Sequence, residues 1–201
     1  MSIDISQNDF PFPTNLSAQV QLYRKEFSDK QITLKPLHLT RDIKTIHKWV
    51  NKPYAQTFWQ MQGSIEILYA HYEKLLQSGK CYSLMAFLKD KPVAQIDYYA
   101  TRFDEIYDLY EYEDNDYGIH LLMGPNKSAI KNLTPDVMVT ALSFLFSIGI
   151  QRIMGEPDAA NEKANKLVQK VGFRFIRQIQ MSYKTANLYE YRKEAFLKIH
   201  G

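Results

Sequence analysis

The spacing of hydrophobic residues changes across residues 116–150, and the change predicts a strand, a loop and a helix. The apolar run over residues 116–124 is short and contains a single histidine, His120, so it has the character of a largely buried strand. From Val137 to Ile148 the apolar residues recur at helical spacing, and Thr134 and Pro135 match an N-cap and a first helical turn. A loop that leads from a strand into a helix exposes backbone N–H groups, so a phosphate can bind there.

The other apolar segments predict further strands and helices. Short or alternating runs predict strands over residues 32–37, 81–88, 93–101, 152–155, 173–183 and 188–196, with a possible strand over 19–27. Helical spacing predicts helices over residues 42–50, 65–77 and 160–171. This order indicates a mixed α/β protein whose sheet joins mostly neighbouring strands. At 201 residues we expect one domain, preceded over residues 1–28 by an arm that includes the possible strand.

The composition is that of an ordinary globular protein, with 45% hydrophobic and 23% charged residues. The single cysteine, Cys81, excludes an internal disulfide and fits a reducing compartment. The N-terminus has neither a basic region nor an apolar run, which argues against a signal peptide. No apolar stretch approaches the roughly 20 residues that cross a bilayer. We therefore expect a cytoplasmic protein without a membrane partner.

The net charge of +3 conceals an uneven distribution. Residues 104–116 hold seven acids and no lysine or arginine, which leaves 15 acids against 25 bases elsewhere. The basic residues are scattered and no nucleic-acid motif accompanies them, so nucleic acid is not an expected partner. The acidic segment has two interpretations. It is a solvated face, or it attracts a cationic substrate that its interleaved tyrosines could cover.

Five motifs occur in an order that is typical of one enzyme family. They are Trp49-Val50-Asn51-Lys52-Pro53, Gly118-Ile119-His120, the loop Lys131-Asn132-Leu133-Thr134, Glu156-Pro157-Asp158-Ala159-Ala160-Asn161 and Gly172-Phe173. Together they resemble the signature regions of the GNAT superfamily of acyl-CoA-dependent N-acyltransferases. More narrowly, they are similar to the branch that acylates side-chain amines or hydroxylamines in hydroxamate siderophore assembly. The resemblance covers about residues 30 to 190 of the chain.

This resemblance implies a fold and a reaction. The fold is a single GNAT-like domain over residues 29–201, with a central, mostly antiparallel, splayed sheet flanked by helices. His120 is the implied catalytic residue, because the matching histidine of the branch takes part in catalysis, and a histidine titrates near neutrality. Asp158 is the second, orienting His120 or holding the amine. Their alternative roles are a core histidine and a turn or N-cap carboxylate.

The implied cosubstrate is acetyl-CoA or another acyl-CoA. The resemblance assigns its binding to residues along the predicted strand, the loop and the following helices: Leu122, Met123, Lys127, Lys131, Asn132, Leu133, Thr134 and Asn161. In the superfamily this loop carries glycines, which let the backbone approach a pyrophosphate closely. Asn132 and Thr134 stand at those positions here. The loop therefore binds CoA along a changed backbone path, binds it weakly, or does not bind it.

The acyl acceptor is assigned to aromatic and polar residues from three parts of the chain: Trp49, Asn51, Trp59, Asp97, Tyr99, Tyr110, Asp114 and Asp116. Tyr99 and Tyr183 are the phenols that could protonate the leaving thiolate. No Cys/His spacing typical of zinc occurs, so no metal is expected.

The function expected from the resemblance is acyl transfer to the terminal amine or hydroxylamine of a small diamine or amino acid, by a monomer or homodimer. One alternative is an acetyltransferase that acts on a protein N-terminus or an aminoglycoside. Another is a non-catalytic GNAT-like binding protein, which the glycine-poor CoA loop suggests.

Overall fold

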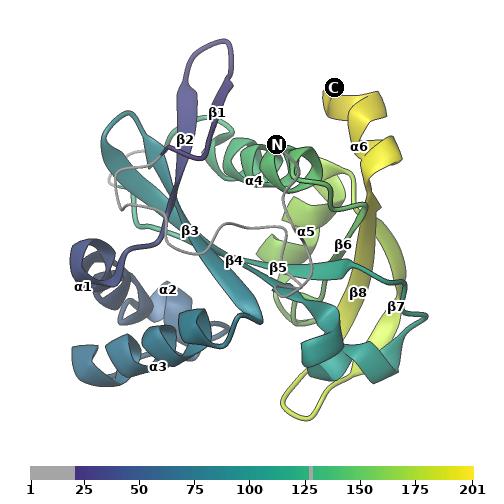
Figure 1. Ribbon diagram of the computed structural model, residues 1–201, viewed down its shortest axis with the longest axis horizontal. Coiled ribbons are helices and arrows are strands. Elements are labelled where there is room, and N and C mark those ends of the chain that lie inside the picture. Colours follow the sequence, from purple (N-terminus) through teal and green to yellow (C-terminus); the bar gives the residue numbers. More distant parts are fainter. Residues whose placement is uncertain (1–20, 127–128) are drawn as a thin grey trace, which may run out of the picture.

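The computed structural model describes residues 21–126 and 129–201, so the predicted CoA ligand Lys127 lies outside the described residues. The described residues form one eight-stranded sheet in the order β1-β2-β3-β4-β5-β6-β8-β7 (Figure 1). Neighbouring strands are antiparallel except β5 and β6, which are parallel. The strands are β1 (Tyr23–Glu26), β2 (Gln31–Pro36), β3 (Cys81–Leu88), β4 (Lys91–Ala100), β5 (Asp116–Met123), β6 (Arg152–Gly155), β7 (Arg174–Gln180) and β8 (Thr185–Arg192). The mixed α/β, mostly antiparallel fold expected from the sequence is confirmed.

The helices cover the two faces of the sheet in two groups (Figure 1). They are α1 (Leu39–Val50), α2 (Pro53–Gln56), α3 (Ile65–Gln77), α4 (Leu133–Ser147), α5 (Glu162–Val171) and α6 (Lys193–His200). Side chains alternate along a strand, so each central strand serves both cores. Ile96 packs with α4 and α5 in one cluster. Met85 and Leu122 pack with α1 and α3 in the other.

The parallel strands β5 and β6 separate after three paired positions. Their pairing runs from Asp116 opposite Arg152 to Gly118 opposite Met154. β6 ends at Gly155, whereas β5 continues to Met123. Beyond Gly118, the edge of β5 that faces away from β4 therefore has no strand partner among the described residues. The sheet opens at this point, immediately before His120.

The start of α4 corrects the helix start predicted from the sequence. Thr134 is not the N-cap, because the helix begins at Leu133 and Asn132 is the N-cap. Asn132 has φ of 55° and ψ of 16°, a left-handed conformation that asparagine tolerates better than most residues. Thr134 lies inside the first helical turn and needs no such conformation. Asn132 thus adopts the left-handed conformation for which the superfamily uses a glycine, and the backbone of Thr134 is ordinary helix.

Two further segments differ from the prediction. The chain after Arg192 forms α6 rather than continuing the last strand, and α6 packs Phe196 against Phe146 and Tyr191. The predicted strand over residues 93–101 ends at Ala100, and two short 3₁₀ helices follow: η1 (Thr101–Phe103), which precedes the acidic segment, and η2 (Glu105–Leu109), which lies within it. In the part of the chain that the structure describes, no helix combines the length and the apolarity that crossing a membrane requires.

Candidate active site

His120 and Glu156 meet where β5 and β6 separate. His120 lies two residues beyond the last paired position of β5, and Glu156 follows the last residue of β6. The distance from His120 Nε2 to Glu156 Oε1 is 2.6 Å. The Glu156 side chain is 2% exposed and the His120 side chain is 40% exposed. One ring nitrogen is therefore held by a buried carboxylate, while Nδ1 has no hydrogen-bond partner among the described residues.

Each member of this pair shifts the pKa of the other. Burial lowers the pKa of His120, but the charge and hydrogen bond of Glu156, together with Asp97, raise it above its ordinary value. Burial raises the pKa of Glu156, yet His120 and Lys184 outweigh burial and lower it to about 2. Glu156 is thus ionised at neutral pH, and it favours the protonated form of His120.

Aromatic rings surround His120 on the face of the sheet that α1–α3 cover. The ring centroids of Tyr99 and His120 are 4.9 Å apart, and those of Trp59 and His120 are 6.3 Å apart. Gly118 makes room for Tyr99, because a Cβ at this position would lie 2.1 Å from the Tyr99 ring. The Tyr99 hydroxyl is buried beside Glu156, and the Trp59 Nε1 is buried beside the Tyr72 hydroxyl. The glycine two residues before the histidine therefore sets the packing of the site.

Lys184 and Asp104 also belong to this site, although the sequence did not single them out. The Lys184 ammonium donates a 2.6 Å hydrogen bond to the Glu156 carbonyl and lies 3.7 Å from Glu156 Oε1. Asp104 caps η2 by accepting from the Ile106 N–H, and burial, together with the charge of Glu156, raises its pKa. Both reach the site from loops that are distant in the chain, so local spacing could not predict that they approach Glu156.

Asp97 lies directly across from His120 on β4 and is 6% exposed. It accepts hydrogen bonds from Ser83 and Gln95, which are also buried. Counting Asp97, Asp104 and Glu156 against Lys184, the surroundings of His120 carry more negative than positive charge. A cationic or neutral acceptor suits such a site better than an anionic one.

Asp158 and Asn161 have local roles in the structure. Asp158 Oδ1 accepts a hydrogen bond from the Ala160 N–H, and no contact joins Asp158 to His120 among the described residues. Glu156, not Asp158, is the carboxylate that orients His120, because it directly ends the strand beside β5. Glu156 belongs to the motif that pointed to Asp158, so the motif was the signal by which it could have been found. Asn161 is the N-cap of α5 and accepts from the Ala164 N–H.

Trp49 and Asn51 support the site rather than line it. Trp49 is buried, and its ring fills the space above Gly124 at the end of β5. Asn51 binds the backbone N–H and carbonyl of Gly63 and so ties the segment that carries Trp59 to the end of α1. Of the residues predicted to hold the acceptor, Trp59, Asp97 and Tyr99 lie around His120.

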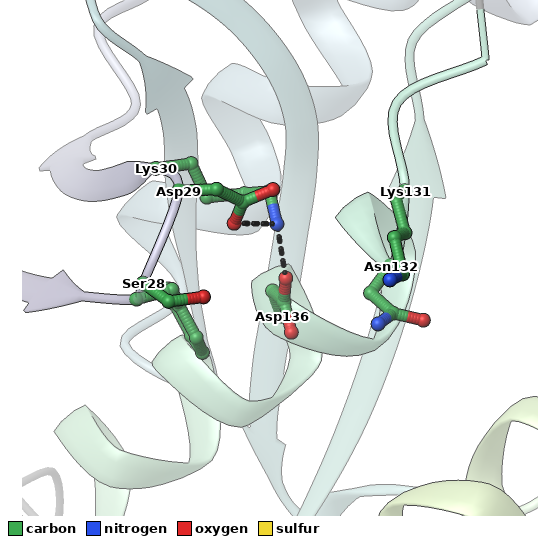
Figure 2. Close-up of a pocket in the computed structure, with 7 residues that line it drawn as sticks. Ser28, Asp29, Lys30, Lys131, Asn132 and Asp136 are labelled. Carbon is green, nitrogen blue, oxygen red and sulfur yellow. Dashed lines mark hydrogen bonds and ion pairs between the residues drawn. The ribbon is translucent and has the colours of Figure 1, made fainter.

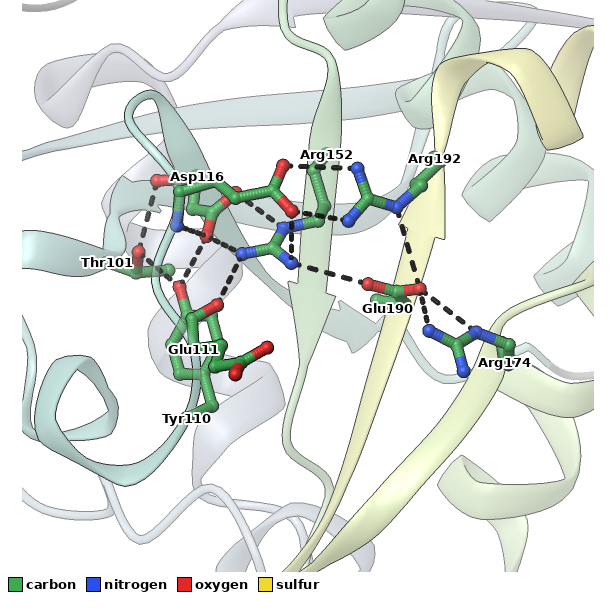
Figure 3. Close-up of polar contacts among 9 residues, drawn as sticks. Thr101, Tyr110, Glu111, Asp116, Arg152, Arg174, Glu190 and Arg192 are labelled. Atoms are coloured by element: carbon green, nitrogen blue, oxygen red, sulfur yellow. Dashed lines mark hydrogen bonds and ion pairs between the residues drawn. The ribbon is translucent and has the colours of Figure 1, made fainter.

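The other three predicted acceptor residues lie in the acidic segment. Asp116 is 1% exposed and is paired with Arg152, whose Nε donates to Asp116 Oδ1 over 2.7 Å. The Tyr110 hydroxyl donates to Asp116 Oδ2 over 2.9 Å, and the Arg152 guanidinium lies 5.5 Å from the Tyr110 ring centroid. Asp114 is exposed. Figure 3 shows this network, in which the Arg152 side chain faces Asp116 on one side and Glu190 on the other. Asp116 and Tyr110 are therefore engaged in the fold and are not available to an acceptor.

The predicted CoA loop leads into the N-terminus of α4. Lys131 and Asn132 are exposed there and line a pocket of about 180 Å³. Figure 2 shows that Lys30 lies opposite them, between Asp29 at 2.7 Å and Asp136 at 2.9 Å. This volume is below the roughly 300 Å³ at which ligand pockets commonly begin. A group of phosphate size fits it better than a whole nucleotide.

The first turn of α4 offers few free backbone donors. The Leu133 N–H donates to the Ile130 carbonyl, Pro135 has no N–H, and Asp136 donates to Asn132. Within the described residues this leaves the Thr134 N–H unpaired. Leu122 is buried against α1–α3, and Met123 accepts from the Tyr54 hydroxyl. The unpaired edge of β5 beyond Gly118 supplies further backbone donors and acceptors beside His120.

The structure shows no grouping of three or more histidine, cysteine or acidic side chains that could hold a metal ion, within residues 21–126 and 129–201. Cys81 is a free, buried thiol.

A family model described as an acetyltransferase (GNAT) domain matches residues 38–181. An N(6)-hydroxylysine O-acetyltransferase of Escherichia coli is 27% identical over 149 residues, which are 73% of this chain but only 47% of that protein. The match thus spans about half the length of this relative. An N-hydroxyputrescine acetyltransferase of Acinetobacter baumannii is 23% identical over 88% of this chain and 86% of its own.

Solved structures agree with the fold. The aminoglycoside acetyltransferase AAC(6')-Ib in complex with coenzyme A superimposes with a TM-score of 0.77 at 17% identity. The alignment covers 85% of this chain and 99% of that one.

Proposed function

The chain belongs to the GNAT acetyltransferase family, and from this premise we propose that it transfers an acetyl group from acetyl-CoA to a small acceptor. The acceptor is a diamine or amino acid whose terminal amine or hydroxylamine is acetylated in siderophore biosynthesis. The observation that carries the proposal is the pair of His120 and Glu156 at the opening between β5 and β6. The names of the two relatives support a hydroxylated terminal nitrogen.

His120 acts as the general base in this proposal. The Nε2–H group of His120 donates a hydrogen bond to Glu156, which fixes the ring. Nδ1 is therefore the nitrogen that takes a proton from the attacking nitrogen of the acyl acceptor. As the acceptor attacks the thioester carbon, a new bond to carbon forms, the carbon–sulfur bond breaks and the thiolate leaves. A side-chain ammonium, with a pKa of about 10.4, must lose a proton before it attacks. A hydroxylamine is already neutral near pH 7 and therefore needs less help.

Acetyl-CoA would lie along the free edge of β5 and end at the start of α4. Within the part of the chain that the structure describes, backbone groups beyond Gly118 have no strand partner on that side, so they can bind the amide groups of the cosubstrate and polarise its thioester. The Thr134 N–H and the exposed Lys131 are the groups that would meet its phosphates.

The small number of free amides at α4 also favours one alternative, a binding protein that has lost acetyl transfer. Isothermal titration calorimetry with acetyl-CoA and with CoA separates the two proposals. An enzyme binds acetyl-CoA and acetylates at least one member of a set of diamines, amino acids and their N-hydroxy derivatives. Absence of acetyl-CoA binding, together with absence of turnover across that set, would favour the binding protein.

The His120→Ala variant tests the residue on which the mechanism depends. We expect kcat to fall about 10²- to 10⁴-fold, the usual contribution of a general base. The thermal midpoint should stay close to that of the wild type, because the side chain is partly exposed. The loss should be smaller for a hydroxylamine than for the parent amine. His38→Ala is the matched control, since the His38 ring pairs with Thr40 at the surface. Wild-type rates from His120→Ala with both acceptors would remove His120 from the mechanism.

A further inference from the structure

We infer that Asp97 and the buried polar atoms around it form a receptor for a second, positively charged nitrogen of the acceptor. This inference rests on the proposed function, because it concerns an acceptor whose reacting nitrogen meets His120. It defines the acceptor as a diamine or an amino acid with a distant ammonium, in preference to a monoamine of the same length.

The position of Asp97 suits the far end of such an acceptor. Asp97 pairs across the sheet with His120 on one side and with Ser83 on the other, so the three side chains share one face. Adjacent strands lie roughly 4.8 Å apart. Asp97 is therefore one strand further than His120 from the opening between β5 and β6. A short aliphatic chain that starts at His120 can reach it along the face of the sheet.

The carboxylate of Asp97 is held in place but is not neutralised. Ser83 Oγ and Gln95 Nε2 both donate to Oδ1. Oδ2 accepts no hydrogen bond, and no lysine or arginine forms an ion pair with Asp97, among the described residues. A buried carboxylate without a cation is costly unless something supplies the charge. Burial accordingly raises the pKa of Asp97, even though both hydrogen bonds and the charges of His120 and His71 act to lower it.

Two further buried oxygens, on residues that neighbour Asp97, add to the acceptors that an ammonium group needs. Gln95 Oε1 is buried and has no hydrogen-bond partner among the described residues, and the buried Tyr72 hydroxyl faces the Trp59 N–H, which leaves one lone pair of the phenol oxygen free. Gln95 and Tyr72 are both 0% exposed. The charge of Asp97 contributes, after burial, to the raised pKa of Tyr72, so the phenol lies within its field. Oδ2, Oε1 and the phenol oxygen are three acceptors for the three N–H groups of an ammonium ion. The rings of Tyr72 and Trp59 add aromatic surface, which attracts cations.

The test compares 1,5-diaminopentane with 1-aminopentane, each also as its N-hydroxy derivative, at saturating acetyl-CoA. We expect the wild type to prefer the diamine through KM. Asp97→Asn should remove that preference by raising KM for the diamine about 10- to 100-fold, as loss of charge-assisted hydrogen bonds predicts, with kcat nearly unchanged. The monoamine should respond little. Asp90→Asn is the matched control, because it removes the same charge from an exposed turn outside the site.

Two outcomes would overturn the receptor. An equal fall in kcat for both acceptors would show that Asp97 acts through His120. Unchanged kinetics with both would show that the polar atoms bind ordered water only. If Asp97→Asn fails to fold, Tyr72→Phe keeps the ring and removes one acceptor, and it should raise KM for the diamine alone.

A direct binding measurement distinguishes failure of the receptor from failure of the proposed function. If the wild type acetylates none of these acceptors, calorimetry with 1,5-diaminopentane tests the receptor by itself. Binding to the wild type that is lost in Asp97→Asn would support the receptor without the reaction. Equal binding to both proteins, or none to either, would overturn it.

Discussion

At the scale of single residues, the balance of charge around His120 determines the pH at which it can accept a proton. Burial and Lys184 destabilise the imidazolium, but Glu156 and Asp97 together stabilise it more, so the pKa of His120 is raised. A base must be unprotonated to act, and activity should therefore increase with pH through this raised pKa. A hydroxylamine acceptor is neutral over most of this pH range. With such an acceptor, the increase of activity with pH therefore reflects the titration of His120 and not that of the acceptor.

Replacing Glu156 with glutamine tests this balance. The amide keeps a hydrogen bond to Nε2 but removes the charge, which leaves burial and Lys184 to lower the pKa of His120. The rising limb of kcat/KM between pH 5 and 9 should move to lower pH, and the plateau should fall because a weaker base is left. Glu162→Gln, on the exposed face of α5, is the control and should leave the profile in place. A limb that stays fixed, or moves to higher pH, would contradict the role given to Glu156.

The order of residues along the chain allowed His120 to be predicted, but not its partner. A polar residue within an apolar strand can be recognised from the sequence alone. Whether Glu156 or Asp158 reaches His120 depends on where β6 ends, and that is set by the two strands separating after Gly118. Lys184 and Asp104 approach through tertiary contacts that leave no periodic signal.

At the scale of elements, strands with clear alternation were predictable and segment ends were not. The central strands and the helices over residues 65–77 and 160–171 occur close to their predicted ranges. The N-cap of α4 is Asn132, two residues before the predicted Thr134. The reason is that Asn132 adopts the left-handed conformation at which the backbone turns into the helix. The first four residues of α6 were predicted as the end of the last strand, since so short a segment carries too few apolar positions to distinguish helical from alternating spacing.

The N-terminus of α4 provides the second prediction. Asn132→Gly should leave the free energy of unfolding nearly unchanged, because glycine adopts the left-handed conformation readily. Asn132→Val should cost about 1–2 kcal/mol, because a side chain at Cβ crowds the next carbonyl in that conformation. The valine variant should also bind CoA more weakly, whereas the glycine variant should not. Urea denaturation and calorimetry provide both measurements.

Lys170→Met separates backbone from side-chain effects at this position. The Lys170 ammonium donates to Asn132 Oδ1 over 3.1 Å, and both glycine and valine remove that contact. If Lys170→Met alone reproduces the behaviour of Asn132→Val, the side-chain contact rather than the backbone conformation controls the loop. Equal stability of the glycine and valine variants would lead to the same conclusion.

At the scale of the whole molecule, the acidic segment is joined to the far half of the sheet by buried ion pairs (Figure 3). Arg152 pairs with Asp116, Glu113 and Glu190, and Glu190 in turn pairs with Arg174. The sequence shows the acids in one run, whereas the arginines come from β6, β7 and the end of β8. The run therefore looked like a site for a cationic acceptor, although two of its seven acids, Glu113 and Asp116, form ion pairs with arginines.

The last prediction tests whether this network stabilises the fold or binds the acceptor. The Arg152 side chain is 6% exposed, and its removal leaves Asp116 and Glu190 buried without their shared cation. Arg152→Met should therefore lower the free energy of unfolding by about 3–5 kcal/mol in urea denaturation. Lys166→Met is the control. It removes a cation from an exposed pair on α5 and should change stability by less than about 1 kcal/mol.

A second substitution identifies the source of that loss. If the cost arises from an unpaired carboxylate, adding Asp116→Asn to Arg152→Met should restore part of the stability, because the amide carries no charge to bury. Both single variants should keep the wild-type KM for the amine at temperatures where they are folded. An Arg152→Met protein as stable as the wild type, with a raised KM for the amine, would return Asp116 to the acceptor site and leave the acidic segment as its binding surface.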